Sequence, residues 1–117
     1  MSIFTEHIKS GRSLIFVQTA LAHYKVIGAL RVKLIPYFST CEHGAMNALV
    51  KYIGHLPKNA ALVCMLPALV TGVKIDASRV IWIEGDTYRT DDPIFDQAMW
   101  RVRGHETARL IITEADV

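Results

Sequence analysis

The sequence predicts an α/β domain of three layers, in which a mostly parallel sheet lies between helices. Apolar runs alternate along the chain with segments of helical periodicity, and this alternation is typical of parallel sheets because each crossover helix covers one face. The predicted strands are apolar throughout, as expected of strands that are buried on both faces. With 117 residues the chain has room for one such domain, residues 1–117.

Five short apolar runs are predicted to be strands. They lie at residues 13–17, 32–38, 60–66, 79–84 and 109–113. Pro36 indicates that the second run is an edge strand or ends near this residue, because proline cannot donate a hydrogen bond to a strand ladder.

The first predicted helix covers residues 20–30. Four apolar side chains recur in it at a spacing of three, which indicates an amphipathic helix. They are Leu21, Tyr24, Ile27 and Leu30. Thr19 precedes the segment and is a suitable N-cap, because its hydroxyl accepts a hydrogen bond from a free backbone N–H.

Two further helices are expected, at residues 43–56 and 93–103. The first follows the sequence Ser39-Thr40-Cys41-Glu42, which has the spacing of a capping box. The second follows Asp92-Pro93, and proline is tolerated in the first turn of a helix.

Composition places the chain among globular proteins, with 51% hydrophobic and 21% charged residues. The longest apolar run, residues 60–70, is too short to cross a bilayer, and the first residues lack the features of a signal peptide. We therefore expect a cytoplasmic protein with no membrane partner. The net charge of +2 is too small to indicate nucleic-acid binding by itself. Cys41 and Cys64 are expected to be reduced.

Several common sites are missing from the sequence. It contains neither the phosphate-binding loop G-x-x-x-x-G-K-[ST] nor G-x-G-x-x-G, which argues against an independent NTPase and a dinucleotide-binding dehydrogenase. No metal site is expected: Cys41, His43 and His55 lack further ligands at suitable spacing. Five acidic residues near the fourth strand are better explained as a solvated loop than as a Mg²⁺ site. They are Glu84, Asp86, Asp91, Asp92 and Asp96.

The segment from Asp92 to Thr107 resembles the last signature motif of superfamily-two helicases, and is most similar to that of Swi/Snf-type translocases. It contains Gln-Ala, two arginines, and then Gly and Thr before a strand. Residues 12–19 resemble the first strand of the second, C-terminal RecA-like lobe, residues 38–53 its next unit, and residues 61–81 its Thr/Gly-rich motif. The resemblance spans residues 11–113 and implies a RecA-like fold.

The sequence departs from the family pattern at four points. The helix after the second predicted strand lacks the usual arginine. Arg103 follows Arg101 by two residues instead of three, with Gly104 in the expected place. Lys74 stands where many relatives carry Asp or Asn. The first lobe, with its phosphate loop and acidic metal-binding motif, is missing. The resemblance therefore implies a stand-alone second lobe. Small separate reading frames of this kind fit phage or viral genomes, and a phage or viral protein would be expected in the host cytoplasm.

The resemblance implies a joint ATP site that three residues complete: Arg101, Arg103 and Gln97, which lies one helical turn before Arg101. Arginine suits this role because its fork stays charged and binds phosphate oxygens bidentately. ATP and Mg²⁺ would bind only together with a first-lobe helicase or ATPase chain, so the protein alone is not expected to be an ATPase. On spacing alone, both arginines are better explained as solvated side chains near a helix C-terminus, where cations are also favoured.

The resemblance also implies contacts with a DNA or RNA backbone, made by hydroxyls and N–H groups at strand-to-helix turns. The candidates are Thr19, Ser39, Thr40, Thr71, Gly72 and Lys74. Helix caps at Thr19 and Ser39 and a tight turn at Gly72 are the structural alternatives. Trp82 and Trp100 are expected to lie in the core because their neighbours are apolar.

Three functions follow from these observations. The first is a helicase C-terminal-like lobe that binds nucleic acid, or that completes or regulates an ATP-driven helicase or translocase in trans. The second is a non-catalytic module of RecA-like fold that binds nucleic acid or protein. The third is an unrelated small α/β enzyme that uses the acidic loop or the pair Cys41 and His43.

Overall fold

We examined the protein in a computed structural model. The structure describes residues 13–39, 59–66, 79–100 and 108–117, together with Phe4, Ile8, His55, Pro57, 75–77 and 102–103. The predicted helix at residues 43–56 lies almost wholly outside the described residues.

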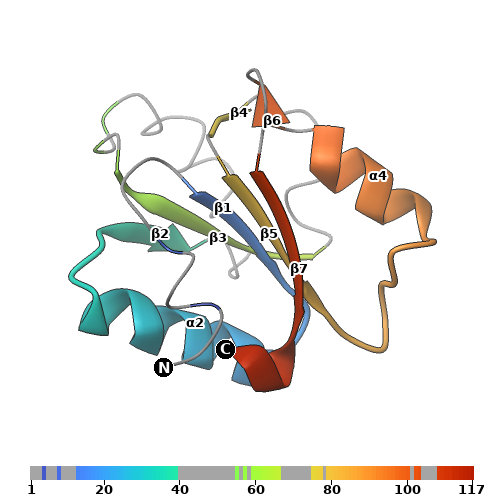
Figure 1. Ribbon diagram of the computed structural model, residues 1–117, viewed down its shortest axis with the longest axis horizontal. Coiled ribbons are helices and arrows are strands. Elements are labelled where there is room, and N and C mark those ends of the chain that lie inside the picture. Colours follow the sequence, from blue (N-terminus) through green and yellow to red (C-terminus); the bar gives the residue numbers. More distant parts are fainter. Residues whose placement is uncertain are drawn as a thin grey trace.

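Five strands form one parallel sheet, as the alternation of strands and helices predicts (Figure 1). In spatial order they are β2 (Tyr37–Ser39), β3 (Ala61–Met65), β1 (Ser13–Val17), β5 (Arg79–Glu84) and β7 (Ala108–Thr113). The central strand β1 aligns Ile15 with Val63 on one side and with Ile81 on the other. All five side chains of β1 are buried, because the strand is paired on both edges and covered on both faces.

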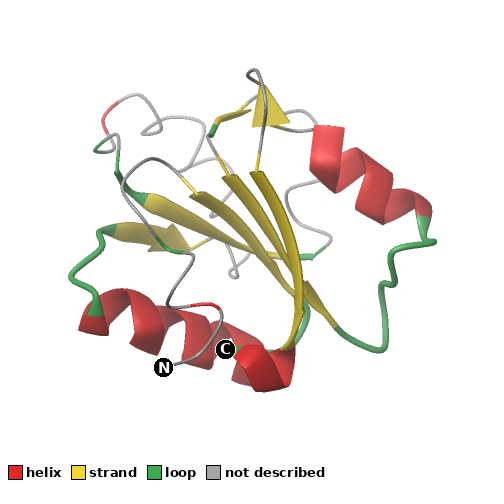
Figure 2. Cartoon of the chain, viewed as in Figure 1, coloured by secondary structure: helices red, strands yellow, loops and turns green. Residues whose placement is uncertain are grey.

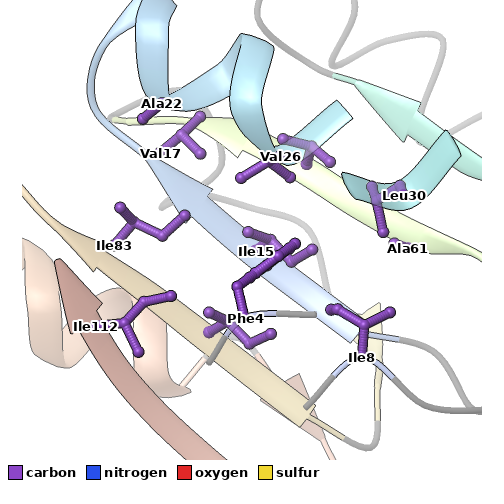
Figure 3. Close-up of a cluster of buried hydrophobic side chains, with 12 residues drawn as sticks. Phe4, Ile8, Ile15, Val17, Ala22, Val26, Leu30, Ala61, Ile83 and Ile112 are labelled. Carbon is purple, nitrogen blue, oxygen red and sulfur yellow. The ribbon is translucent and has the colours of Figure 1, made fainter. Parts of the chain in front are cut away.

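Two helices cover opposite faces of the sheet, which gives the three layers (Figure 2). Helix α2 (Ala20–Val32) packs with Ala22, Val26 and Leu30 on a face of aliphatic side chains from β1, β3, β5 and β7 (Figure 3). Phe4 and Ile8 close the same cluster. Helix α4 (Pro93–Trp100) places Ala98 and Met99 on the other face.

Trp82 is the largest side chain of the core beneath α4. Its ring lies 6.1 Å from the ring of Phe16 and meets Phe95 edge-on at 5.0 Å. The expected core position of Trp82 is confirmed, whereas the side chain of Trp100 lies outside the described part. The indole Nε1 of Trp82 is buried and finds no hydrogen-bond acceptor among the described residues.

The prediction of a strand from residue 32 is wrong at its start. Helix α2 continues to Val32 and ends in a Schellman turn, in which Ile35 N donates to Leu30 O at 2.9 Å and Leu34 N to Arg31 O at 3.1 Å. Leu34 takes the left-handed position of this turn, with φ 56°. That position is usually glycine, and the apolar Leu34 gives no sequence signal for a turn, so the segment was predicted to be a strand.

The predicted buried face of α2 is also partly wrong. Leu21 and Tyr24 are exposed, and Ala22, Val26 and Leu30 are buried. In a helix of 3.6 residues per turn, each step of three residues shifts the side-chain direction by about 60° around the axis. A series with a strict spacing of three therefore moves away from the core-facing side. A step of four residues shifts the direction by only about 40°. Ala22, Val26 and Leu30 have this spacing and therefore stay on the core-facing side.

The helix predicted to reach Arg103 ends at Trp100. Strand β6 (Val102–Arg103) follows and pairs in parallel with β4 (Ile75–Asp76). At Val102 and Arg103, strand pairing with β4 thus takes the place of the helical hydrogen bonds that were expected there. β4 precedes β5 and β6 precedes β7 along the chain, so this small ribbon lies at the amino ends of those strands (Figure 1).

The remaining strand predictions agree with the structure within one residue at each end. Thr19 is the N-cap of α2, as predicted: its Oγ1 accepts a hydrogen bond from Ala22 N at 3.0 Å. Cys64 is buried, and its Sγ lies 3.9 Å from Leu62 O. No helix among the described residues is long and apolar enough to cross a membrane.

Candidate functional site

The carboxyl ends of all five parallel strands meet at one edge of the sheet, where ligands of open α/β sheets usually bind. Thr19 follows β1 at this edge and is exposed. Besides capping α2, its hydroxyl donates to Glu114 Oε2 at 3.3 Å, from the short helix η2 (Glu114–Asp116) that follows β7. Thr19 must therefore release Glu114 before its hydroxyl donates to a phosphate.

Ser39 is the last residue of β2 and is half-buried. Its Oγ lies 2.6 Å from Nε2 of His23, which stands one helical turn after Thr19 in α2. Burial lowers the pKa of His23 from the usual 6.5, because desolvation penalises the charged ring. The contact joins the end of β2 to the first turns of α2 and so brings Thr19, His23 and Ser39 to one edge.

The sequence interpretation missed His23. The available signal was its position four residues after the predicted N-cap, which places both side chains on the same side of the helix. The expected parallel sheet already placed Ser39 at the same edge as the start of that helix.

The other predicted site residues divide into two groups. Gln97 is exposed on α4, and Arg103 lies in β6, at the amino ends of the strands and thus away from Thr19 and Ser39. Arg103 therefore does not continue the helix of Gln97, contrary to the expectation. Five predicted residues lie outside the described part: Thr40, Thr71, Gly72, Lys74 and Arg101.

The segment after β5 is fixed to β1 by one side chain. The amide of Gln18 donates to Tyr88 O at 2.6 Å and to Ile83 O at 3.3 Å, and its Oε1 accepts from Tyr88 N at 2.9 Å. Gly85 lies against this amide: a Cβ on it would stand 2.7 Å from Gln18 Oε1. The absence of a side chain at residue 85 is therefore what lets Gln18 reach Tyr88.

An open depression of about 580 Å³ lies beside this segment, at the ends of β5 and β7. It is lined by Glu84, Gly85, Asp86, Arg89, Thr90, Asp91 and Thr113. Its carboxylates are exposed, and Asp92 caps α4 by accepting a hydrogen bond from Ile94 N at 3.0 Å. In the described residues no three His, Cys, Asp or Glu side chains are grouped to hold a metal ion.

The architecture belongs to a known class. The protein has an α/β RecA-like fold, with an all-parallel five-stranded sheet between helices. A solved structure that it resembles is the C-terminal domain of the DEAD-box protein Dbp5, with a TM-score of 0.68 and 16% sequence identity over 95% of this chain and 67% of that chain. No family model and no curated protein matches the sequence. At this identity the likeness shows the fold.

Proposed function

We propose that the chain, residues 1–117, is a helicase-type C-terminal lobe that binds the backbone of DNA or RNA. The observation that carries the proposal is the placement of Thr19, His23 and Ser39 at the carboxyl edge of a sheet with the fold of a DEAD-box protein's C-terminal domain. Hydroxyls and the free N–H groups of a helix N-terminus bond phosphate oxygens without reading bases.

The chemistry of this edge suits a phosphate backbone. A neutral His23 ring is able to accept the Ser39 proton or to donate its own, so the Ser39 hydroxyl adjusts to a phosphate oxygen nearby. Thr19 supplies a second hydroxyl once Glu114 has moved away. Thr40, Thr71, Gly72 and Lys74 complete the proposed backbone-binding set.

The test is a titration of labelled 12-nucleotide DNA and RNA strands by fluorescence anisotropy between 50 and 200 mM salt. A lobe that neutralises a few phosphates loses affinity as salt rises, with a log–log slope of about −0.7 per phosphate for single strands. Binding that does not change with salt, or no binding at the lowest salt, contradicts the proposal.

We further propose that Arg101, Arg103 and Gln97 complete an ATP site together with a separate first-lobe chain of helicase or ATPase type, of the Swi/Snf kind. The sequence has no phosphate loop of its own, so ATP and Mg²⁺ would be held jointly and the partner would supply that loop. The cytoplasm, including that of a host cell for a phage or viral protein, is the compartment this role implies. Reconstitution with a first-lobe chain tests this part separately from nucleic-acid binding.

A further inference from the structure

The outward face of α2 is apolar where a surface helix is normally polar. Leu21, Tyr24 and Val32 form one stripe along it, with exposed fractions of 56%, 76% and 82%. Gly28 lies within the stripe, and a Cβ on it would meet no atom within 4 Å. Figure 1 shows α2 at the periphery, with the sheet on one side of it. Folding of the described core therefore does not explain these apolar side chains.

Leu34 extends the stripe past the end of the helix and is 89% exposed. It has a positive φ of 56°, a conformation that strains a residue with a Cβ and does not strain glycine. A leucine here thus makes the fold less stable and leaves a large apolar side chain in water. Strained residues cluster at functional sites, and this strain therefore motivates a search for a function of this surface.

The end of the stripe at Val32 and Leu34 is positively charged. Arg31 and Lys33 are exposed beside Val32 and Leu34, and the sequence contains no acidic residue between Glu6 and Glu42. The guanidinium of Arg31 is held in place, because its Nε donates to the Tyr37 hydroxyl at 3.1 Å and its carbon lies 6.0 Å from the centre of that ring. Because Nε is the nitrogen that bonds Tyr37, the two terminal nitrogens remain for the fork geometry of a carboxylate.

We propose that this face, defined as Leu21, Tyr24, Arg31, Val32, Lys33 and Leu34, docks a short acidic and amphipathic segment of a partner protein. The apolar stripe takes the segment's apolar side chains, and Arg31 and Lys33 pair with its carboxylates. The stripe has four exposed apolar side chains, far fewer than the ~20–30 residues that each partner contributes to a standard interface, which suits a peptide. The proposal does not depend on nucleic-acid binding at the other end of α2.

Three other occupants fit less well. A phosphate backbone pairs with Arg31 and Lys33 but gains nothing from Leu21, Val32 or Leu34. A second copy related by a two-fold axis brings like charges together, which opposes association. An anionic lipid surface attracts basic residues without requiring a fixed direction, whereas Arg31 is fixed by Tyr37.

The test selects random 12-residue peptides displayed on phage against the full chain and measures the enriched peptides by calorimetry. We expect peptides that combine several Asp or Glu with apolar residues. Leu34→Gly should weaken them at least tenfold although it raises the melting temperature, and Arg31→Glu should weaken them similarly. Ile111→Ser removes an exposed apolar side chain from β7 and should leave the affinity within twofold.

Some outcomes overturn the proposal. They are a selection without enrichment, enriched peptides that lack acidic residues, and peptides that bind Leu34→Gly as well as the natural protein. Two further results, each in the absence of peptide binding, would assign the face to another occupant. Binding to phosphatidylserine vesicles that the same variants abolish would assign it to a membrane. Self-association in sedimentation that the same variants abolish would assign it to a second copy.

Discussion

The side-chain amide of Gln18 pairs with the backbone of Tyr88 through both its oxygen and its nitrogen, at 2.9 and 2.6 Å. These bonds tie the end of β1 to the loop after β5, across 70 residues of sequence. The loop lines the depression at the carboxyl edge. One side chain thus attaches this loop to the end of β1.

Gln18→Ala should lower the free energy of unfolding by about 1–3 kcal/mol, because part-buried backbone groups of Tyr88 and Ile83 lose their partner. Gly85→Ala should produce a similar loss by forcing the same amide away. In urea denaturation the double variant should lose clearly less than the sum of the two. Additive losses would show that Gly85 and Gln18 act independently.

Leu34→Gly should stabilise the protein by about 1 kcal/mol, because glycine adopts the positive φ of the Schellman turn without strain. Leu34→Ala is the matched control: it removes the exposed side chain, keeps the strained Cβ and should leave the urea midpoint nearly unchanged. Equal stabilisation by both variants would mean that exposure of Leu34, and not its backbone, is what costs stability.

The lowered pKa of His23 predicts that stability depends on pH. The unfolded chain binds a proton near pH 6.5, and the folded chain binds it only at lower pH, so folding is favoured by the neutral ring. The free energy of unfolding should therefore be constant above about pH 7 and fall as the pH drops below 6.5. His23→Gln should flatten this part of the urea-midpoint profile. A profile unchanged by the substitution would contradict the assignment to His23.

Arg101→Ala should leave folding intact and lower the ATPase of a reconstituted pair with a first-lobe chain by ~10³-fold, the size of effect seen when an arginine finger is lost. Arg101→Lys should not restore the rate fully, because a point charge lacks the bidentate geometry. The steady-state ATPase rate with saturating nucleic acid measures both. An unchanged joint ATPase would remove Arg101 from the proposed site.

Four strands, β1, β3, β5 and β7, were predictable because they are short apolar runs between polar turns, and buried parallel strands carry that signal directly. The end of α2 was not, because Leu34 occupies a position where glycine would have marked the turn. The contact between His23 and Ser39 was not predictable either, since 16 residues separate the two and only the packed helix brings them together. Thr19 was correctly predicted as an N-cap, because that role rests on local spacing.

A comparison of Thr19→Asp with Thr19→Asn in the nucleic-acid titration tests whether the carboxyl edge of the sheet binds the phosphate backbone. Both residues are good N-caps, so α2 should stay folded in both variants, and circular dichroism checks this. Only aspartate adds a negative charge at the carboxyl edge. The account predicts that Thr19→Asn keeps most of the affinity at low salt and that Thr19→Asp loses at least tenfold. Equal affinities for the two variants would place the nucleic acid elsewhere and contradict the account.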